Sequence, residues 1–260
     1  MTSADDRDEM WARRAGSFGS HARAYAEHRP DYPAAAVRWA LEPLGGSSLG
    51  RSSLEVLDLA AGTGKLTAVL VAEGHQVTAV EPDEKMLAEL VRRNEEVRAL
   101  PGSAERVPLP DRSVDAVLVG QAFHWFDRDA ALPEIARVLR PGGVLAGLWN
   151  YGDLSVPWVA EFDRIGHDGT NRGVSDVDQV MPDHELFTGS ARATFPHVHR
   201  RTAETLVATV GTQSHVLVAA EEERRALREQ VLAFLRARPE TAEGEFDFPL
   251  TTHVKRMTRA

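Results

Sequence analysis

The chain has 260 residues, no cysteine and a formal net charge of −9. The lack of thiols excludes disulfides, thiolate zinc sites and a cysteine nucleophile, and the acidic balance argues against nucleic-acid binding, which needs a basic face. The hydrophobic fraction of 43 % suffices for the core of one domain, and no segment approaches the roughly 20 apolar residues that span a bilayer. Met1 to Met10 is polar and acidic, which predicts a disordered, cytoplasmic start.

The first patterned stretch, from Trp11 to Pro33, predicts an amphipathic cap helix. Its characteristic positions recur three and four residues apart until prolines end the pattern. These positions are Phe18, Ala22, Tyr25, Arg29, Pro30 and Pro33. A second helix is predicted from Ala34 to Leu44, and the Ser/Gly-rich run from Gly45 to Ser53 is predicted to be a linker.

The next stretch carries the clearest signal of ligand binding. Val56 to Leu59 predicts a short apolar strand, and a helix is expected from Lys65 until Gly74, a typical residue after a helix C-terminus. Between them, Gly62 and Gly64 permit backbone dihedral angles that a Cβ forbids and let main-chain N–H groups approach a ligand. A strand, a glycine turn and a helix N-terminus together predict a nucleotide site.

Three nucleotide-binding patterns compete for this turn. A Walker A loop would need glycine at Leu59 and Ser or Thr at Leu66, so that pattern fails. A dinucleotide fingerprint would need a third glycine where Thr67 stands.

The third pattern is Asp58-x-Ala60-x-Gly62-x-Gly64, which resembles the first motif of class I S-adenosylmethionine (SAM) methyltransferases. Alanine stands at position 60, where that family more often has glycine. The resemblance implies a Rossmann-like fold, with SAM as methyl donor and S-adenosylhomocysteine as product. It also implies cofactor contacts from the residues of the turn, which are Asp58, Ala60, Gly62, Thr63 and Gly64.

A second apolar strand, Gln76 to Val80, leads into Glu81, which lies 17 residues beyond Gly64. Because parallel strands end at the same edge of a sheet, we expect Glu81 beside the glycine turn, where its two oxygens would bind both ribose hydroxyls. The alternative is a solvated acid before a helix. Pro82 suits the first helical position, and Met86 either covers the adenine edge or belongs to the core.

Val97 to Leu100 predicts a third strand, followed by a loop that begins Gly102-Ser103-Ala104-Glu105. In the methyltransferase pattern this loop holds adenine, so the resemblance implies cofactor contacts from Ser103, Ala104 and Glu105. Ser103 stands where the family commonly has Asp. Ala104 would offer its backbone N–H, and Glu105 has the alternative of being a surface acid.

The fourth predicted strand, Val114 to Val119, opens into Gln121-Ala122-Phe123-His124-Trp125-Phe126-Asp127. Loops at the carboxyl ends of parallel strands form the ligand crevice. Two aromatic residues flanking a histidine there indicate more than core filling. A lone histidine is usually structural, so a catalytic and a structural role for His124 both stay open on position alone.

Two longer runs narrow the resemblance to the trans-aconitate methyltransferase-like branch. They are Phe-x3-Ala-x2-Tyr-x3-Arg-Pro-x-Tyr-Pro, which starts at Phe18, and Ala-x-His-Trp-Phe, which starts at Ala122. The branch implies that Tyr25 and Arg29 face the methionine end of the cofactor or the substrate. The branch also implies that Gln121 faces the methionine end of the cofactor or the substrate.

The resemblance also suggests roles around the transferred methyl group. His124 is predicted to be the general base or the donor that orients the acceptor. Phe18, Trp125 and Trp149 are predicted to form an apolar, cation-friendly wall. The run Thr212-x-Ser214 resembles a turn of the family, which implies an acceptor contact from Ser214.

The remaining pattern completes the predicted fold. Asp129 to Leu139 predicts a helix that Pro141-Gly142-Gly143 ends before a fifth strand, Val144 to Trp149. Gly166 to Ser190 is polar and is predicted to be a lid or binding loop. The later elements are helices at Val156 to Ile165, Thr202 to Val210 and Glu221 to Arg238, and strands at Ala193 to Arg200 and Phe248 to Met257.

The predicted fold class is α/β and Rossmann-like, with a seven-stranded, mostly parallel sheet and a reversed last strand. Residues 1–50 would be N-terminal cap helices and residues 51–150 the SAM-binding core. Residues 151–260 would supply the substrate-binding insertion and closing strands of the same domain. No metal site is expected, because His197 and His199 share a strand face without an evident third ligand.

The predicted function is methyl transfer from SAM to a small-molecule acceptor, with O-methylation of a small acid or secondary metabolite favoured. The alternatives are a SAM-binding module without catalysis, a C- or N-methyltransferase, and a nucleotide-dependent oxidoreductase. No nucleic-acid or membrane partner is expected. The sequence names neither the acceptor nor the oligomeric state.

Overall fold

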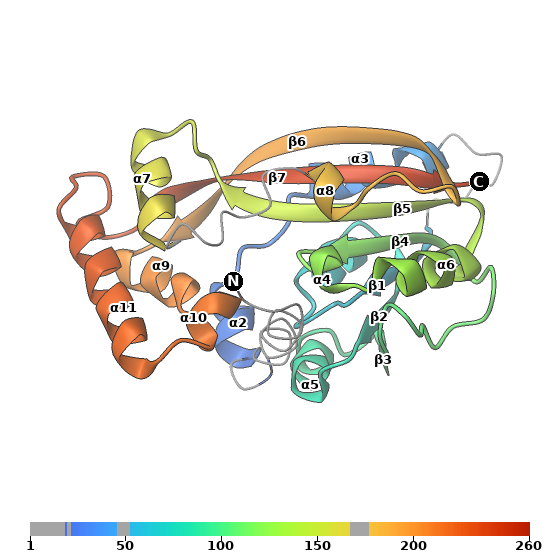
Figure 1. Ribbon diagram of the computed structural model, residues 1–260, viewed down its shortest axis with the longest axis horizontal. Coiled ribbons are helices and arrows are strands. Elements are labelled where there is room, and N and C mark those ends of the chain that lie inside the picture. Colours follow the sequence, from blue (N-terminus) through green and yellow to red (C-terminus); the bar gives the residue numbers. More distant parts are fainter. Residues whose placement is uncertain (1–18, 20–21, 46–52, 167–176) are drawn as a thin grey trace, which may run out of the picture. The chain divides into compact units, whose positions relative to one another are not determined.

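The computed structural model describes residues 19, 22–45, 53–166 and 177–260 (Figure 1). The described residues fall into two compact units. Unit 1 draws on Met1–Pro30, Gly152–Gly173 and Pro196–Thr251. Unit 2 draws on Asp31–Tyr151, Val174–Phe195 and Thr252–Ala260.

Seven strands form one sheet in the order β3-β2-β1-β4-β5-β7-β6. Parallel pairing joins β1 to β2 and β4, β2 to β3, and β4 to β5, whereas β7 runs opposite to β5 (Figure 1). The strands are β1 Glu55–Leu59, β2 Gln76–Glu81, β3 Arg98–Pro101, β4 Val114–Gly120, β5 Leu139–Gly152, β6 Phe187–Arg201 and β7 Phe246–Arg259. The predicted mostly parallel sheet with a reversed last strand is therefore confirmed.

Helices cover both faces of the sheet in unit 2. On one face, α3 and α4 pack against Val56, Leu118 and Leu148. On the other face, α6 and α8 pack against alternate residues of the same strands, such as Leu57 and Val117. This alternation explains why the central strands are apolar throughout. The helices of this unit are α3 Ala34–Gly45, α4 Lys65–Ala72, α5 Glu84–Arg93, α6 Arg128–Val138 and α8 Val177–Val180, with a 3-10 turn η2 at Phe123–Trp125.

Unit 1 has an apolar core of its own. Phe162, Leu206 and Leu235 come from three different helices and pack with the first residues of β7, such as Phe248. The helices of this unit are α2 Ala22–His28, α7 Pro157–Gly166, α9 Ala203–Val210, α10 Ser214–Leu217 and α11 Glu221–Arg236. The charged helix predicted near the C-terminus is confirmed as α11, in which Val231 and Leu235 are buried.

The prediction that Pro141-Gly142-Gly143 separates a helix from a strand is wrong. Helix α6 ends at Val138, and β5 already begins at Leu139. The pairing of β4 with β5 shifts its register between Val114 and Ala116, and such a bulge accommodates the positive φ of 76° at Gly142. The three residues therefore lie inside the strand.

Two further boundaries differ from the sequence pattern. Part of the predicted lid, Phe187 to Ser190, belongs to β6, and residues 167–176 of that lid lie outside the described part. Pro82 precedes α5 instead of starting it, because Asp83 is the N-cap and accepts hydrogen bonds from the backbone N–H groups of Lys85 and Met86. The predicted helix from Trp11 is described only as α2, and the predicted linker lies largely outside the described residues. No helix in the described ranges is long and apolar enough to cross a membrane.

Candidate active site

The glycine turn follows β1 directly and repeats a left-handed backbone conformation. Ala60 and Gly62 both have φ of 57°, and Gly64 has φ of 84°. The N–H of Ala61 donates to the carbonyl oxygen of Val80 at 3.1 Å, which fixes the turn to the end of β2. Ala60 adopts a conformation that costs an L-residue roughly 1–2 kcal/mol, so the local strain is held by the surrounding hydrogen bonds.

Glu81 lies against this turn, as its position after β2 predicts. Its Oε2 accepts a 2.9 Å hydrogen bond from the N–H of Gly62, and its Oε1 accepts one of 2.9 Å from the N–H of Asp83. The side chain is only 7 % exposed. Burial raises the pKa of the Glu81 carboxyl, and the two backbone hydrogen bonds partly oppose that shift. Since each carboxylate oxygen accepts more than one hydrogen bond, both retain capacity for a ligand hydroxyl.

Asp58 is buried completely below the same turn, at the end of β1. Its Oδ2 accepts a 2.5 Å hydrogen bond from the hydroxyl of Thr67, which joins β1 to α4. Burial raises the pKa of Asp58 to about 7; the Thr67 hydrogen bond opposes this shift and the charge of Glu81 adds to it. Within the described residues, Oδ1 of Asp58 has no hydrogen-bond partner.

Met86 packs against the turn at Gly62, and Thr63 is part of the turn. Met86 is 4 % exposed, and its Cε would lie 3.6 Å from a Cβ at Gly62. Thr63 is also buried and borders a cavity of about 280 Å³. The lining residues of that cavity are Asp31, Thr63, Gly64, Lys65, Ala68, Arg93 and Asn94. Pro82 is exposed.

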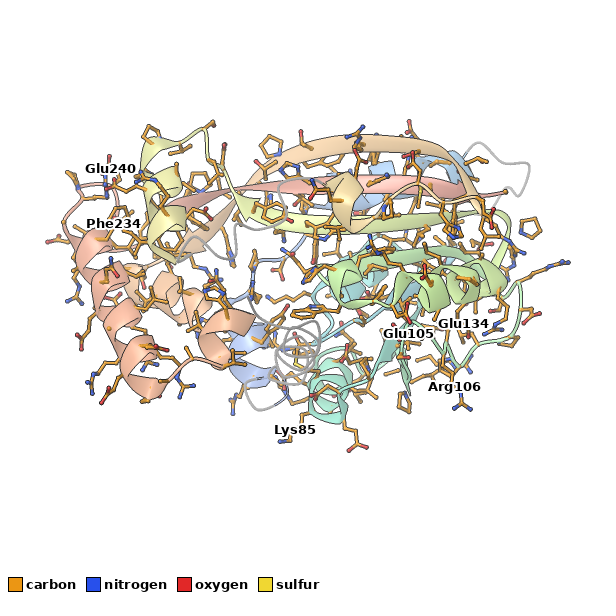
Figure 2. All side chains as sticks on the ribbon, viewed as in Figure 1. Lys85, Glu105, Arg106, Glu134, Phe234 and Glu240 are labelled. Carbon is orange, nitrogen blue, oxygen red and sulfur yellow. The ribbon has the colours of Figure 1, made fainter. Side chains whose placement is uncertain are left out.

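The loop after β3 is tied to α6 by two carboxylates. Oε1 of Glu105 accepts a hydrogen bond from the N–H of Asp127 at 3.1 Å, and Oε1 of Glu134 accepts one from the N–H of Val107 at 2.9 Å; both acids are labelled in Figure 2. Ser103 bridges to Arg106 within the loop. Ala104 is 3 % exposed and belongs to the core cluster that packs against α6. The loop is therefore held rigidly next to the ends of β2 and β3.

The carboxyl end of β4 carries the aromatic-histidine run. Gln121 has φ of 56°, and its Nε2 donates a 2.8 Å hydrogen bond to the carbonyl oxygen of Asn150 at the end of β5. The rings of His124 and Trp125 lie 4.8 Å apart in the turn η2, and both are partly buried. Phe123 is completely buried in the core, so the prediction that both flanking aromatics do more than fill the core is wrong for Phe123.

The glycine turn, Glu81 and the loop after β4 all lie at the carboxyl ends of parallel strands. Known proteins that resemble this chain are methyltransferases. Residues 57–147 match the methyltransferase domain family. Over 246 residues the chain is 39 % identical to an uncharacterized methyltransferase of Mycobacterium tuberculosis, which covers 94 % of this chain and 96 % of that protein. The chain belongs to the class I SAM-dependent methyltransferases.

A solved structure and a further relative agree with this membership. The structure of a putative type II methyltransferase from Anaeromyxobacter dehalogenans is 26 % identical, with a TM-score of 0.63 over 89 % of this chain and 97 % of that one. A malonyl-[acyl-carrier protein] O-methyltransferase of Methylococcus capsulatus is 36 % identical over 185 residues, which is 66 % of this chain and 65 % of that protein.

The residues of this methyltransferase fit an adenosyl cofactor in two respects. Glu81 is oriented by backbone N–H groups at the turn and keeps acceptor capacity for a ribose. Oδ1 of Asp58 is a buried acceptor that finds no donor within the described residues, which is the condition that a bound donor would relieve. Their contacts with the cofactor, like those of the other predicted residues, stay predictions.

Trp149 of the methyltransferase lies in the core and not at an open surface. It is 1 % exposed within the cluster that also contains Phe123 and Met257. Its ring occupies the space that a Cβ at Gly147 would need. The predicted role of Trp149 in a wall around the methyl group stays a prediction, and its packing gives this tryptophan a structural role as well.

Several predicted residues belong to unit 1 or lie outside the described part. The guanidinium of Arg29 lies 5.1 Å from the ring centre of Tyr25, and its Nη2 donates to the carbonyl oxygen of Thr212 at 3.0 Å. Ser214 begins α10. Phe18 lies outside the described residues. The predicted contacts of these four residues with cofactor or acceptor therefore stay predictions.

A polar network around Asn150 of the methyltransferase was not predicted from the sequence. Its Nδ2 donates to the carbonyl oxygen of Asp31 at 3.1 Å, and its Oδ1 accepts a 2.5 Å hydrogen bond from the hydroxyl of Thr252. Asp31 in turn pairs with Lys65 at 2.8 Å, at the start of α4. A polar residue directly after a buried strand was the available signal. The described residues contain no group of three or more His, Asp or Glu side chains arranged to hold a metal ion.

Proposed function

We propose that this methyltransferase transfers the methyl group of SAM to an oxygen atom of a small-molecule acceptor. The reaction would take place in the crevice at the carboxyl ends of β1, β2 and β4. The observation that carries the proposal is the pairing of Glu81 with the N–H of Gly62, because it sets an acidic hydrogen-bond acceptor at the mouth of the glycine turn. Such an acceptor at this edge of a parallel sheet suits the hydroxyls of a ribose.

The cofactor would be held by three groups of residues. Glu81 would bind the ribose, and Met86 with the loop from Ser103 to Glu105 would enclose the adenine. The glycine turn and Asp58, with Gln121, would meet the methionine part, which Tyr25 and Arg29 are also proposed to approach. When bound, SAM supplies a methyl group that its sulfonium already activates for transfer.

The protein's own contribution is mainly to position the acceptor. Holding two reactants in line is worth on the order of 7–11 kcal/mol, which the packed loop after β4 is suited to provide. His124 is partly buried beside Trp125, and we propose that its imidazole takes the proton of an acceptor hydroxyl. A general base of this kind adds about 10²–10⁴-fold in rate. Phe18, Trp125, Trp149 and Ser214 are proposed to surround the acceptor.

One observation supports transfer to oxygen, and another argues against a nucleic acid as acceptor. The relative from Methylococcus capsulatus, whose alignment covers 66 % of this chain, bears the name of an O-methyltransferase. The net charge of −9 does not favour a nucleic acid as acceptor.

The test is a transfer assay with SAM that carries a tritiated methyl group. The full chain would be incubated with a panel of phenols, enols and carboxylic acids, and S-adenosylhomocysteine would be quantified beside the labelled product. We expect label in at least one hydroxyl or carboxyl acceptor, with one S-adenosylhomocysteine formed for each methyl group. Tight SAM binding without any labelled acceptor would contradict catalysis, and label only on carbon or nitrogen would contradict O-methylation.

A further inference from the structure

Two aromatic side chains at the end of the sheet in unit 2 remain without a role in the mechanism above. Tyr151 lies at the end of β5 and His253 lies on β7, which neighbours β5 in the sheet. Their ring centres are 5.4 Å apart and their planes meet at 77°, which is an edge-to-face contact. Both residues are partly buried.

The polar tips of this pair are not used by the protein. Within the described residues, neither the hydroxyl of Tyr151 nor a ring nitrogen of His253 makes a hydrogen bond, and neither group is enclosed in the interior. Burial of the rings raises the pKa of Tyr151 and lowers the pKa of His253. Both side chains are therefore neutral near pH 7, and each offers its polar tip to a ligand.

The pair lies at the same edge of the sheet as the aromatic-histidine run. Tyr151 directly follows Asn150, whose carbonyl oxygen accepts the hydrogen bond from Gln121 at the end of β4. Tyr151 and Trp125 also pack against the same core cluster, so they lie on the same face of the sheet. In open α/β sheets, ligands bind outside the carboxyl ends of the strands, and this is where the hydroxyl of Tyr151 is available.

The charged side chain nearest to this pair on β7 indicates whether a charged ligand would be favoured. Lys255 follows His253 by two residues and therefore lies on the same side of β7. It is 1 % exposed, and its Nζ is paired with Asp178 at 2.9 Å and with Asp183 at 2.8 Å. The cation that β7 places next to the pair is thus already neutralised, and a carboxylate ligand would gain little from it.

We propose that Tyr151 and His253 recognise the methyl acceptor, and that they select an uncharged hydroxyl compound, a phenol or an enol, over a carboxylate. His253 accepts a hydrogen bond from a hydroxyl of the acceptor other than the one whose proton His124 takes, and the hydroxyl of Tyr151 donates to an oxygen of the acceptor. The edge-to-face contact of the two rings offers an aromatic acceptor an apolar surface beside these polar tips. This inference rests on the proposed function, whose acceptor class it narrows.

The experiment compares two probes of the same shape, 4-methylphenol and 4-methylbenzoate. Each would be titrated into the full chain saturated with S-adenosylhomocysteine, while NMR follows the imidazole signals of His253. We expect 4-methylphenol to shift these signals saturably and to bind at least tenfold more tightly than 4-methylbenzoate. No shift with 4-methylphenol, or equal affinity for the two probes, would overturn the proposal.

Two variants separate recognition from packing. Tyr151→Phe and His253→Phe keep an aromatic pair but remove one polar tip each, so we expect unchanged melting temperature and unchanged affinity for S-adenosylhomocysteine. We expect each to weaken binding of 4-methylphenol about tenfold. Unchanged affinity for the phenol in both variants would show that the pair only packs the sheet. If the wild-type chain failed to bind S-adenosylhomocysteine at all, the proposed function itself would be wrong, which is a different result.

Discussion

The backbone N–H of Gly62 donates a 2.9 Å hydrogen bond to Oε2 of Glu81. The bond joins the turn after β1 to the end of β2, and the N–H of Asp83 holds the other carboxylate oxygen at 2.9 Å. A carboxylate held at both oxygens is oriented before any ligand arrives. Such preorganisation lowers the cost of binding, because little side-chain freedom remains to be lost.

Glu81→Gln is therefore expected to weaken SAM binding. The amide has one acceptor oxygen instead of two, so it cannot accept from both backbone N–H groups and from two ribose hydroxyls. Hydrogen bonds to charged groups contribute about 1.5–3 kcal/mol, which corresponds to a loss of roughly 10- to 100-fold in affinity. Isothermal titration calorimetry with S-adenosylhomocysteine measures this loss of affinity. Glu89→Gln is the matched control, because Glu89 pairs with Arg92 on the surface of α5; equal affinity of the two variants would refute the ribose contact.

The two glycines of the turn are expected to respond differently to alanine. A Cβ at Gly64 would lie 2.6 Å from Nδ2 of Asn94 and 2.9 Å from Cγ of Leu90, whereas a Cβ at Gly62 meets only Met86, at 3.6 Å. Both positions have positive φ, which costs about 1–2 kcal/mol for an L-residue. Overpacking adds about 1–3 kcal/mol at Gly64.

Gly64→Ala should accordingly lower the free energy of unfolding more than Gly62→Ala does, by about 1–3 kcal/mol in urea titrations. For Gly62→Ala and the larger Gly62→Val we expect cofactor affinity to fall more than stability does. A side chain at position 62 would occupy the surface of the turn that is proposed to contact the cofactor. A Gly62→Val protein with wild-type affinity for SAM would show that the turn does not contact the cofactor.

His124→Ala should lower kcat with near-normal cofactor affinity. The side chain lies in the turn η2, beyond the end of β4, while the glycine turn proposed to bind SAM follows β1. If the imidazole accepts the acceptor's proton, the loss in kcat is about 10²–10⁴-fold. His75→Ala is the control, because His75 precedes β2 at the opposite end of that strand. Turnover of His124→Ala equal to that of the control would assign His124 a structural role.

The central strands β1, β2 and β4 were predictable from the sequence because they are short, mostly apolar runs with glycine nearby. The pattern also predicted that Glu81 would lie beside the glycine turn, since parallel strands of adjacent βα units end at one edge. Local patterns could not predict the β-bulge that draws Gly142 into β5, because a bulge depends on pairing with the neighbouring strand.

The polar contacts of the site were less visible in the sequence. Asn150 binds Asp31 and Thr252, which lie 119 and 102 residues away, and no periodicity encodes contacts over such separations. Glu105 shows the same limit. Its carboxylate accepts a hydrogen bond from the backbone N–H of Asp127 at the start of α6, 22 residues later. The sequence offered two interpretations of Glu105, a cofactor contact or a surface acid, and neither included this structural partner.

Asp58 provides a prediction about the dependence of stability on pH. Burial raises its pKa to about 7 in the folded chain, whereas an unfolded aspartate titrates near ~3.9. Between these two values the folded state holds a proton that the unfolded state has released. The stabilisation by protonated Asp58 is therefore fully present below about pH 4 and is lost as the pH rises through about 7.

Asp58→Asn should remove this dependence, because the amide is neutral at every pH and its oxygen can still accept the hydrogen bond from Thr67. At about 1.36 kcal/mol per pH unit, the variant should gain on the order of 2 kcal/mol relative to wild type between pH 5.5 and pH 7.5. Urea unfolding of both proteins at these two pH values measures the difference, and other titrating groups cancel because both chains carry them. A constant difference would mean that Asp58 does not change its protonation state between these two pH values, which would contradict a pKa raised to about 7.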